Sequence, residues 1–175
     1  MLFNSAEFLI FFPIVTLVYF LIPQKVKWVW LLLASYYFYM CWNPKYALLM
    51  AASTVITYLS GVLIAKANKN PDKNRAARAK KLTVAASFLS NLGILVFFKY
   101  SGFLTDSVNA LLHFFGKSAV MPRFDVVLPV GISFYTFQAL SYTMDVYRGE
   151  IQAEKNPFRY ALFVSFFPQL VAGPI

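Results

Sequence analysis

The sequence predicts an all-α fold: a single transmembrane domain built as a polytopic helical bundle, with one amphipathic helix at the membrane interface. Of the 175 residues, 59% are hydrophobic and 19% aromatic, and 13% are charged, which is about half the share found in an ordinary soluble domain. Several apolar stretches also reach the roughly 17–25 residues that a helix needs to cross a bilayer. The lysines and arginines gather in the gaps between these stretches.

The first three predicted spans cover residues 6–22, 28–42 and 46–65. Pro13 lies inside the first span and is expected to kink it, because proline removes a backbone donor. The second span is short and aromatic at both ends, so it is either a thin or tilted crossing or a re-entrant element. The third span carries small residues at helical spacing, and this stripe predicts close helix packing rather than chemistry. The stripe consists of Ser53, Thr57, Ser60 and Gly61.

Residues 66–81 are predicted to form a cytoplasmic basic loop. They contain seven basic residues and one acid, Asp72. Lysine and arginine are enriched in cytoplasmic loops, where they also contact anionic headgroups. With the N-terminus outside, twelve of the sixteen basic residues fall inside and four outside, provided that the second span crosses. We therefore expect a multi-pass protein of the cell (inner or plasma) membrane with its N-terminus outside. Its +9 charge sets topology in the lipid bilayer and does not indicate nucleic-acid binding.

Two different helices are predicted after the basic loop. Residues 82–98 form the fourth span, with Asn91 at its centre, where an asparagine most often bonds to another helix. Residues 101–115 have apolar side chains at helical spacing, while Asp106, Asn109 and His113 fall on the opposite side. This pattern predicts an amphipathic helix that lies in the interface plane.

The fifth predicted span, residues 128–147, carries the candidate site. Asp145 and Arg148 are three residues apart and can pair, which lowers the cost of each charge. Polar groups at membrane depth usually face a bundle interior or a wet cavity. The stripe can therefore hold helices together, line a substrate channel, or do both. The channel candidates are Tyr135, Gln138, Tyr142, Asp145 and Arg148, of which the first four fall, with Gly131, along one helical face.

The last apolar segment, residues 157–172, is predicted to be a partial or re-entrant helix. Asn156 suits the N-cap and Pro157 the first helical position. Pro168 follows too soon for the intervening apolar stretch to cross the membrane. A re-entrant hairpin and an interrupted span both fit this pattern.

The residues alone predict no catalytic group, no metal site and no bound cofactor. His113 is the single histidine and falls on the polar face of the predicted interfacial helix, and Cys41 is the single cysteine. The sequence contains no glycine-rich phosphate loop and no spacing typical of zinc ligands. A transporter would also carry broken spans and polar stripes, although residues 1–98 and 99–175 show no convincing repeat of the kind that transporters carry.

Three segments resemble the membrane-bound O-acyltransferase family, and specifically its bacterial alginate O-acetyltransferase-like branch. They are MLFNSAEFLIFFP at 1–13, LPVGISFYTFQ continuing to DVYRG at 128–149, and FFPQLVAGP at 166–174. The resemblance implies a funnel through the membrane and transfer of an acyl group, usually acetyl, to a hydroxyl of an exported polysaccharide. It also implies acetyl-CoA or another acyl thioester as donor, and an extracytoplasmic acyltransferase as a partner.

The resemblance also implies that the catalytic histidine lies beyond Ile175, because the family places it downstream of the Gly-Pro motif. His113 matches no such position. We therefore expect the 175 residues to be an N-terminal, incomplete part of the transmembrane domain, inactive alone because a positioned base is missing. Two further functions fit the same residues: D-alanyl transfer to teichoic acid, which the same family carries out, and a non-catalytic role as an interaction protein.

Overall fold

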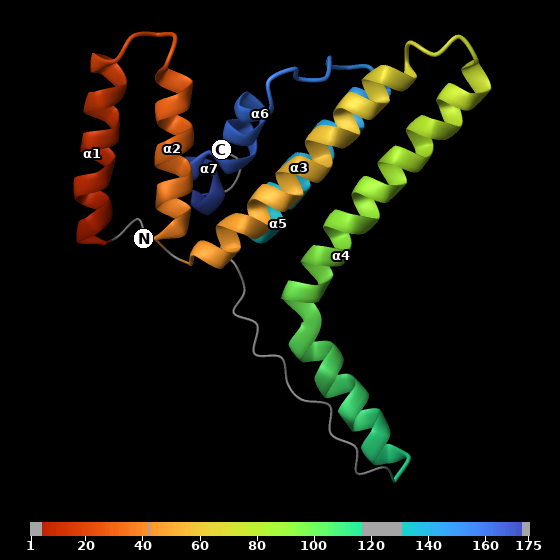
Figure 1. Ribbon diagram of the computed structural model, residues 1–175. Helices are drawn as coiled ribbons and strands as arrows, with labels where there is room; N and C mark the ends of the chain where they lie inside the picture. The colour runs from red at the N-terminus through yellow and green to blue at the C-terminus, as the bar shows by residue number, and fades with distance from the viewer. Residues whose placement is uncertain (1–4, 42, 117–130, 173–175) are drawn as a thin grey trace.

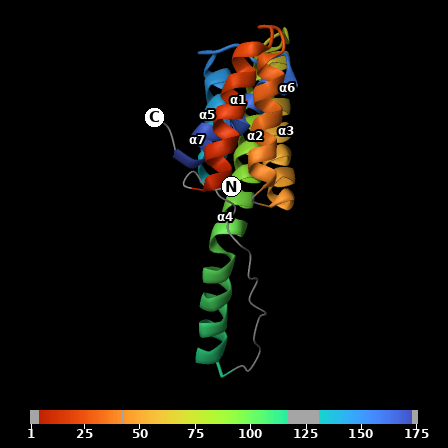
Figure 2. The ribbon, with the colours of Figure 1, turned by 90° about the vertical axis from the view of Figure 1, so that its left-hand side faces the viewer.

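The computed structural model describes residues 5–41, 43–116 and 131–172, and every regular element in these ranges is a helix. Figures 1 and 2 show α1, α2, α3 and α5 side by side, with one half of α4 projecting from the bundle. The helices are α1 (Ala6–Leu21), α2 (Lys27–Met40), α3 (Pro44–Ala67), α4 (Lys73–Phe114), α5 (Ile132–Arg148), α6 (Pro157–Ser165) and α7 (Phe167–Ala172).

The centre of the molecule is formed by α3, α4 and α5, which pack against one another. Met50 and Ile64 of α3, Leu95 of α4 and Tyr135 and Ala139 of α5 belong to one buried cluster. On the far side of α3, α2 packs against α6, and α1 lies outermost against α2. A smaller cluster joins Val15, Phe38 and Phe167 of α1, α2 and α7.

Helix α3 has the reverse of the polarity expected in water. Its buried face is rich in small and hydroxyl residues, including Ser53, Thr57 and Gly61, beside the apolar Met50 and Ile64. Its outward face carries Leu48 and Leu63, exposed by 73% and 53%. In a soluble helix the apolar stripe faces the core, whereas helices in lipid associate through small residues. The small-residue stripe is thus confirmed as a packing face, and its polarity is that of a membrane helix.

The predicted bond from Asn91 to another helix is also confirmed. Ser53 Oγ of α3 donates a hydrogen bond to Asn91 Oδ1 of α4, and Asn91 Nδ2 donates to the Ser87 carbonyl 2.9 Å away. Asn91 is 1% exposed, so the bond crosses the buried interface between α3 and α4.

Within the described ranges, two helices are long and apolar enough to cross a membrane, namely α3 and α4. Helix α1 is apolar but has 16 residues, and α2 and α5 have 14 and 17. At 1.5 Å per residue these three extend about 21–26 Å, less than the roughly 30 Å of a hydrocarbon core. The five-span bundle therefore stays a prediction.

Three connections between helices lie at the same end of the bundle, which we call the basic end. Figure 1 shows the α1–α2 turn, the α3–α4 turn and the α5–α6 segment at this end. The charges on and beside these connections are predominantly basic. They include Lys25, Lys27, Lys69, Arg148, Lys155 and Arg159.

The prediction that residues 66–81 form a loop is wrong, because only residues 68–72 are non-helical there. Helix α3 continues to Ala67, and α4 begins at Lys73. Asp72 caps α4 by accepting hydrogen bonds from the amides of Asn74 and Arg75 at 3.0 and 3.1 Å. Alanine, lysine and arginine are strong helix formers, so the basic segment extends the helix instead of interrupting it.

The predicted division between a span at 82–98 and a separate helix at 101–115 is also wrong, because α4 is continuous from Lys73 to Phe114. The chain between them offers no helix breaker. Helix α4 instead changes direction in its middle, as Figure 1 shows. Within α4, Thr105 Oγ1 donates to the Ser101 carbonyl at 2.9 Å, and such back-bonded hydroxyls often bend helices.

The segment 157–172 forms two short helices, with Phe166 between them in a non-helical conformation. If α6 continued, Pro168 could not donate to the Val164 carbonyl and its ring would clash with it, so α6 ends before Pro168. Nine residues in α6 and six in α7 extend about 14 and 9 Å, so neither helix can cross a bilayer. Of the other predicted bounds, residues 42 and 128–130 lie outside the described residues.

Candidate functional site

A cavity of about 410 Å³ opens at the basic end, between the end of α5, the α5–α6 segment and α6. Two of the predicted site residues line it, Tyr142 and Asp145. Opposite them the cavity carries both an acidic and a basic group, Glu154 and Arg159. Tyr160 and Phe163 add aromatic surface. The lining therefore combines hydroxyl, carboxylate and guanidinium groups with aromatic surface.

Tyr142 is held from two sides. Its hydroxyl accepts a hydrogen bond from the Glu154 amide at 2.8 Å. Its ring lies against the Tyr160 ring, with centroids 4.4 Å apart. Gly61 of α3 provides the space, because a Cβ there would lie 2.9 Å from Tyr142 Cε1. The glycine of the small-residue stripe therefore lets the tyrosine enter the α3–α5 interface.

The α5–α6 segment is fixed by capping. Glu154 Oε1 accepts from the amides of Lys155 and Asn156 at 2.8 and 2.9 Å. The Asn156 side chain then accepts from the Phe158 and Arg159 amides, which starts α6. The predicted roles of Asn156 and Pro157 are confirmed, and the turn they create brings Glu154 and Arg159 to the same cavity.

A chain of hydrogen bonds runs from the cavity into the helix core. The Tyr160 hydroxyl donates to Thr57 Oγ1 at 2.8 Å, and Thr57 Oγ1 donates to the Ser53 carbonyl at 2.8 Å. Ser53 Oγ in turn bonds to Asn91. Tyr160, Thr57 and Ser53 are each at most 2% exposed. The cavity is thus connected to α3 and α4 by polar contacts that water does not reach.

Gln138 lies closer to the middle of α5 and ties it to the C-terminal helices. Its Nε2 atom donates to the Phe163 carbonyl at 2.9 Å and to Gln169 Oε1 at 3.2 Å. At the start of α5, Gly131 has a φ of +75°, and a Cβ there would lie 2.6 Å from the Leu170 carbonyl oxygen. Both contacts hold α7 against α5.

The other two predicted site residues lie elsewhere. Tyr135 is fully buried, and its ring meets Tyr39 of α2 edge-on at 6.4 Å. Arg148 is exposed and its ion pair is with Glu150, at 3.8 Å, so the predicted pairing with Asp145 is wrong. Gly149 explains the difference: it ends α5 in a left-handed conformation (φ +81°) and turns the chain so that Glu150 lies beside Arg148. The structure therefore brings Tyr142 and Asp145 to one cavity and leaves Tyr135 and Arg148 outside it.

Glu154, Arg159 and Tyr160 were not predicted as site residues. The signal that could have found them is the Asn156-Pro157 helix start, which reverses the chain and places residues on both sides of it next to α5. His113 lies on the projecting half of α4 and is exposed. Throughout the described ranges, no three His, Cys, Asp or Glu side chains are grouped so that they could hold a metal ion.

Known proteins resemble this chain along its whole length. It is 38% identical over 176 residues to the "Probable alginate O-acetylase AlgI" of Pseudomonas aeruginosa, of which it covers 32%. It is 39% identical to the protein of the same name from Azotobacter vinelandii, covering 34% of it. It is 33% identical over 207 residues to the "Peptidoglycan O-acetyltransferase" of Helicobacter pylori, covering 37% of that protein.

The chain therefore spans about a third of the length of these curated relatives, while all of the chain is aligned. No protein-family model matches the chain, and no solved structure matches it.

Proposed function

Because this chain belongs to the membrane-bound O-acyltransferase family, we propose that the protein transfers an acetyl group to hydroxyl groups of an exported polysaccharide. The observation that carries this proposal is the whole-length similarity to relatives named as O-acetylating enzymes of alginate and of peptidoglycan. In the reaction a carbon–oxygen bond forms at the acceptor hydroxyl, the thioester carbon–sulfur bond breaks, and the hydroxyl proton passes to a base. We propose a histidine as that base, as the family resemblance implies.

The protein is proposed to work as a multi-pass membrane protein with its N-terminus outside. The reversed polarity of α3 and the all-round apolar α1 support a lipid environment. The clustering of basic connections at one end supports a cytoplasmic basic end, since lysine and arginine favour that side. The last third of α4, from about Gly102 to Phe114, is proposed to lie on the opposite membrane surface, because it is amphipathic and α4 is too long to lie wholly within the span.

The cavity at the basic end is proposed to admit the cytoplasmic donor, acetyl-CoA or another acyl thioester. Tyr142, Asp145 and Arg159 would orient the donor through hydrogen bonds and charge. From there the face of α5 with Gln138 and Tyr135 points along the helix toward the opposite end, where the polysaccharide acceptor and an extracytoplasmic acyltransferase partner are proposed to act.

Substitutions introduced into the intact gene test the proposed role of the cavity in binding the acyl donor. Asp145→Asn removes the carboxylate charge from the cavity while keeping its size, and we expect O-acetyl transfer from labelled acetyl-CoA to fall by about tenfold or more, since a hydrogen bond to a charged group contributes about 1.5–3 kcal/mol. Glu150→Gln is the matched control, because Glu150 lies on the exposed surface beside Arg148. Its activity should equal that of the wild type.

The acceptor and the acyl group are tested in the same assay. Membranes are supplied with alginate or peptidoglycan fragments, and with labelled acetyl or D-alanyl donors. Acetyl transfer to one polymer, lost in Asp145→Asn, supports the proposal and names the acceptor. D-alanyl transfer, or wild-type turnover in an Asp145→Asn protein that is present at normal abundance, would contradict it.

A further inference from the structure

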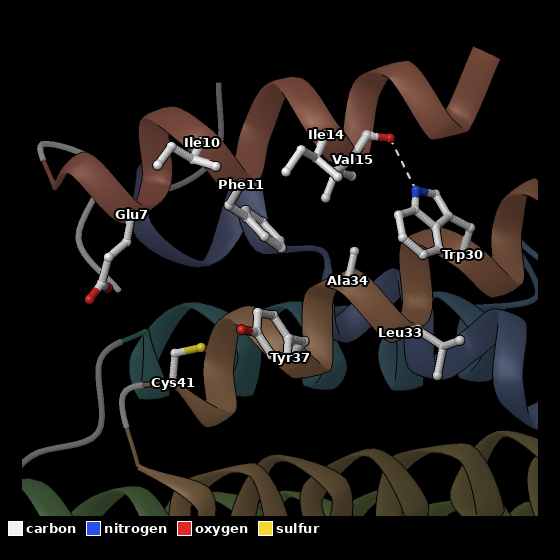
Figure 3. Close-up of a pocket in the computed structure, with 10 residues that line it drawn as sticks. All are labelled: Glu7, Ile10, Phe11, Ile14, Val15, Trp30, Leu33, Ala34, Tyr37 and Cys41. Atoms are coloured by element: carbon white, nitrogen blue, oxygen red, sulfur yellow. Dashed lines mark hydrogen bonds between the residues drawn. The ribbon is translucent and has the colours of Figure 1, made fainter. Parts of the chain in front are cut away.

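A groove of about 810 Å³ runs between α1 and α2 and is distinct from the cavity at the basic end. Figure 3 shows it with Glu7 and Cys41 at one end and Trp30 at the other. Its walls between these ends are apolar. They consist of Ile10, Phe11, Ile14 and Val15 of α1 and Leu33, Ala34 and Tyr37 of α2.

Helices α1 and α2 contact each other at one end of the groove and again part-way along it. At the Trp30 end, the Trp30 indole donates to the Val15 carbonyl at 3.0 Å. Between this end and Glu7, the Phe11 and Tyr37 rings stack with centroids 6.0 Å apart. Between them Ala34 is too small to fill the space, and Ile14 and Leu33 stay 53% and 60% exposed.

The dimensions of the groove match one acyl chain. Glu7 and Val15 are eight residues apart, which is about 12 Å along a helix. One leaflet of the hydrocarbon core is about 15 Å thick, half of the roughly 30 Å bilayer core. An apolar surface left without neighbours loses dispersion contacts. A lipid chain of one leaflet, lying parallel to α1, restores them.

The charge at the Glu7 end of the groove determines which lipid headgroup would be favoured there. The Glu7 side chain is exposed in the first turn of α1. Among the described residues the ion pairs join Arg75 to Asp72 and Arg148 to Glu150, so no basic side chain neutralises Glu7 there. A carboxylate at headgroup depth is stabilised by a cation that also donates hydrogen bonds.

We propose that the α1–α2 groove is a binding site for one phospholipid with a primary-amine headgroup, whose acyl chain lies between Glu7 and Trp30 and whose ammonium group pairs with Glu7. The site requires a membrane location but does not depend on acyl transfer. Lipid binding can therefore be tested independently of the proposed function.

Quenching of Trp30 by lipids with brominated acyl chains tests the site, because bromine quenches tryptophan on contact. The chain has three tryptophans, and Trp28→Phe with Trp42→Phe leaves Trp30 alone. In detergent micelles, titration with brominated phosphatidylethanolamine should quench Trp30 saturably. Half-quenching should need about two- to fivefold less of this lipid than of brominated phosphatidylglycerol, the preference that an exposed ion pair provides.

Two substitutions with matched controls separate the headgroup from the acyl chain. Glu7→Gln should remove the preference for phosphatidylethanolamine, whereas Glu150→Gln at the basic end should keep it. Ile14→Phe should fill the groove and weaken quenching by either lipid, whereas Leu17→Phe should not, because Leu17 is 62% exposed but does not line the groove. Both Phe variants add bulk to an exposed position of α1, so loss of folding affects neither selectively.

Equal half-quenching concentrations for the two lipids would overturn the assignment of the headgroup. Unquenched Trp30 in every lipid would show that a protein segment covers the groove, and would overturn the site itself. Since the readout is fluorescence, failure here leaves the acetyl-transfer assay unaffected.

Discussion

Gly61 and Gly93 are both helical glycines, yet only one of them has a neighbour that requires the missing side chain. A Cβ on Gly61 would lie 2.9 and 3.0 Å from Cε1 and the hydroxyl of Tyr142, whereas nothing lies within 4 Å of a Cβ on Gly93. Tyr142 cannot move away freely, because Glu154 and Tyr160 hold it. Gly61 therefore keeps a cavity residue in place.

Gly61→Ala is expected to destabilise the protein by about 1–3 kcal/mol, the usual cost of overpacking. Gly93→Ala is the control and should stabilise by about 0.5–1 kcal/mol, since alanine favours helix. Thermal unfolding in detergent measures both. A Gly61→Ala protein as stable as Gly93→Ala would show that Tyr142 has room to shift.

Gly131 and Gly149 are a second matched pair, one at each end of α5. Both have positive φ, +75° and +81°, but only Gly131 faces a neighbour, the Leu170 carbonyl. Alanine at Gly149 should cost about 1–2 kcal/mol for the left-handed backbone. Alanine at Gly131 should cost more and also release α7.

Limited proteolysis of the C-terminal segment, together with unfolding temperature, measures this difference. We expect Gly131→Ala to be cleaved near α7 faster than Gly149→Ala. Equal cleavage of the two variants would mean that the contact with Leu170 contributes nothing.

Helix α4 is the element that departs most from what its sequence suggests. Its 42 residues extend about 63 Å, twice the hydrocarbon thickness. The sequence shows the change from an apolar to an amphipathic pattern, and that change by itself favours two helices. An amphipathic pattern indicates which surroundings each face of a helix contacts. Whether the helix continues depends instead on the absence of a helix breaker, and α4 bends without ending.

Labelling of introduced cysteines tests whether the last third of α4 lies at the membrane interface. Leu111 and His113 are both exposed in the structure but lie on opposite faces of the helix. In a Cys41→Ser background, a water-soluble maleimide should label a cysteine at 113 much faster than one at 111 in membranes, because lipid covers the apolar face. Similar labelling rates in membranes would contradict an interfacial position, and similar rates in detergent solution serve as the control.

At the scale of the whole molecule, the sequence predicted the helical class, the membrane environment and the small-residue packing face. These depend on composition and on helical periodicity, which are local properties. The cavity was only half predicted, because Tyr142 and Asp145 belong to a visible stripe whereas Glu154 and Arg159 reach it through a chain reversal. Arg148 was misplaced because the Gly149 cap redirects the chain within one residue.

The topology of the whole molecule leads to a labelling prediction. In the same Cys41→Ser background, cysteines in place of Lys25 or Lys69 lie at the basic end, and one in place of Lys45 lies at the start of α3. A membrane-impermeant reagent added to intact cells should label only position 45. Labelling at 25 or 69 before cell lysis would reverse the proposed orientation.

The ring of Phe11 lies 5.5 Å from that of Phe167, edge-on. Phe11 and Phe167 lie 156 residues apart in the sequence, so the α1–α2 hairpin is synthesised well before its aromatic neighbour from α7. Assembly of this corner consequently requires α7, and until α7 is made α1 and α2 lack the ring of Phe167 that packs against them.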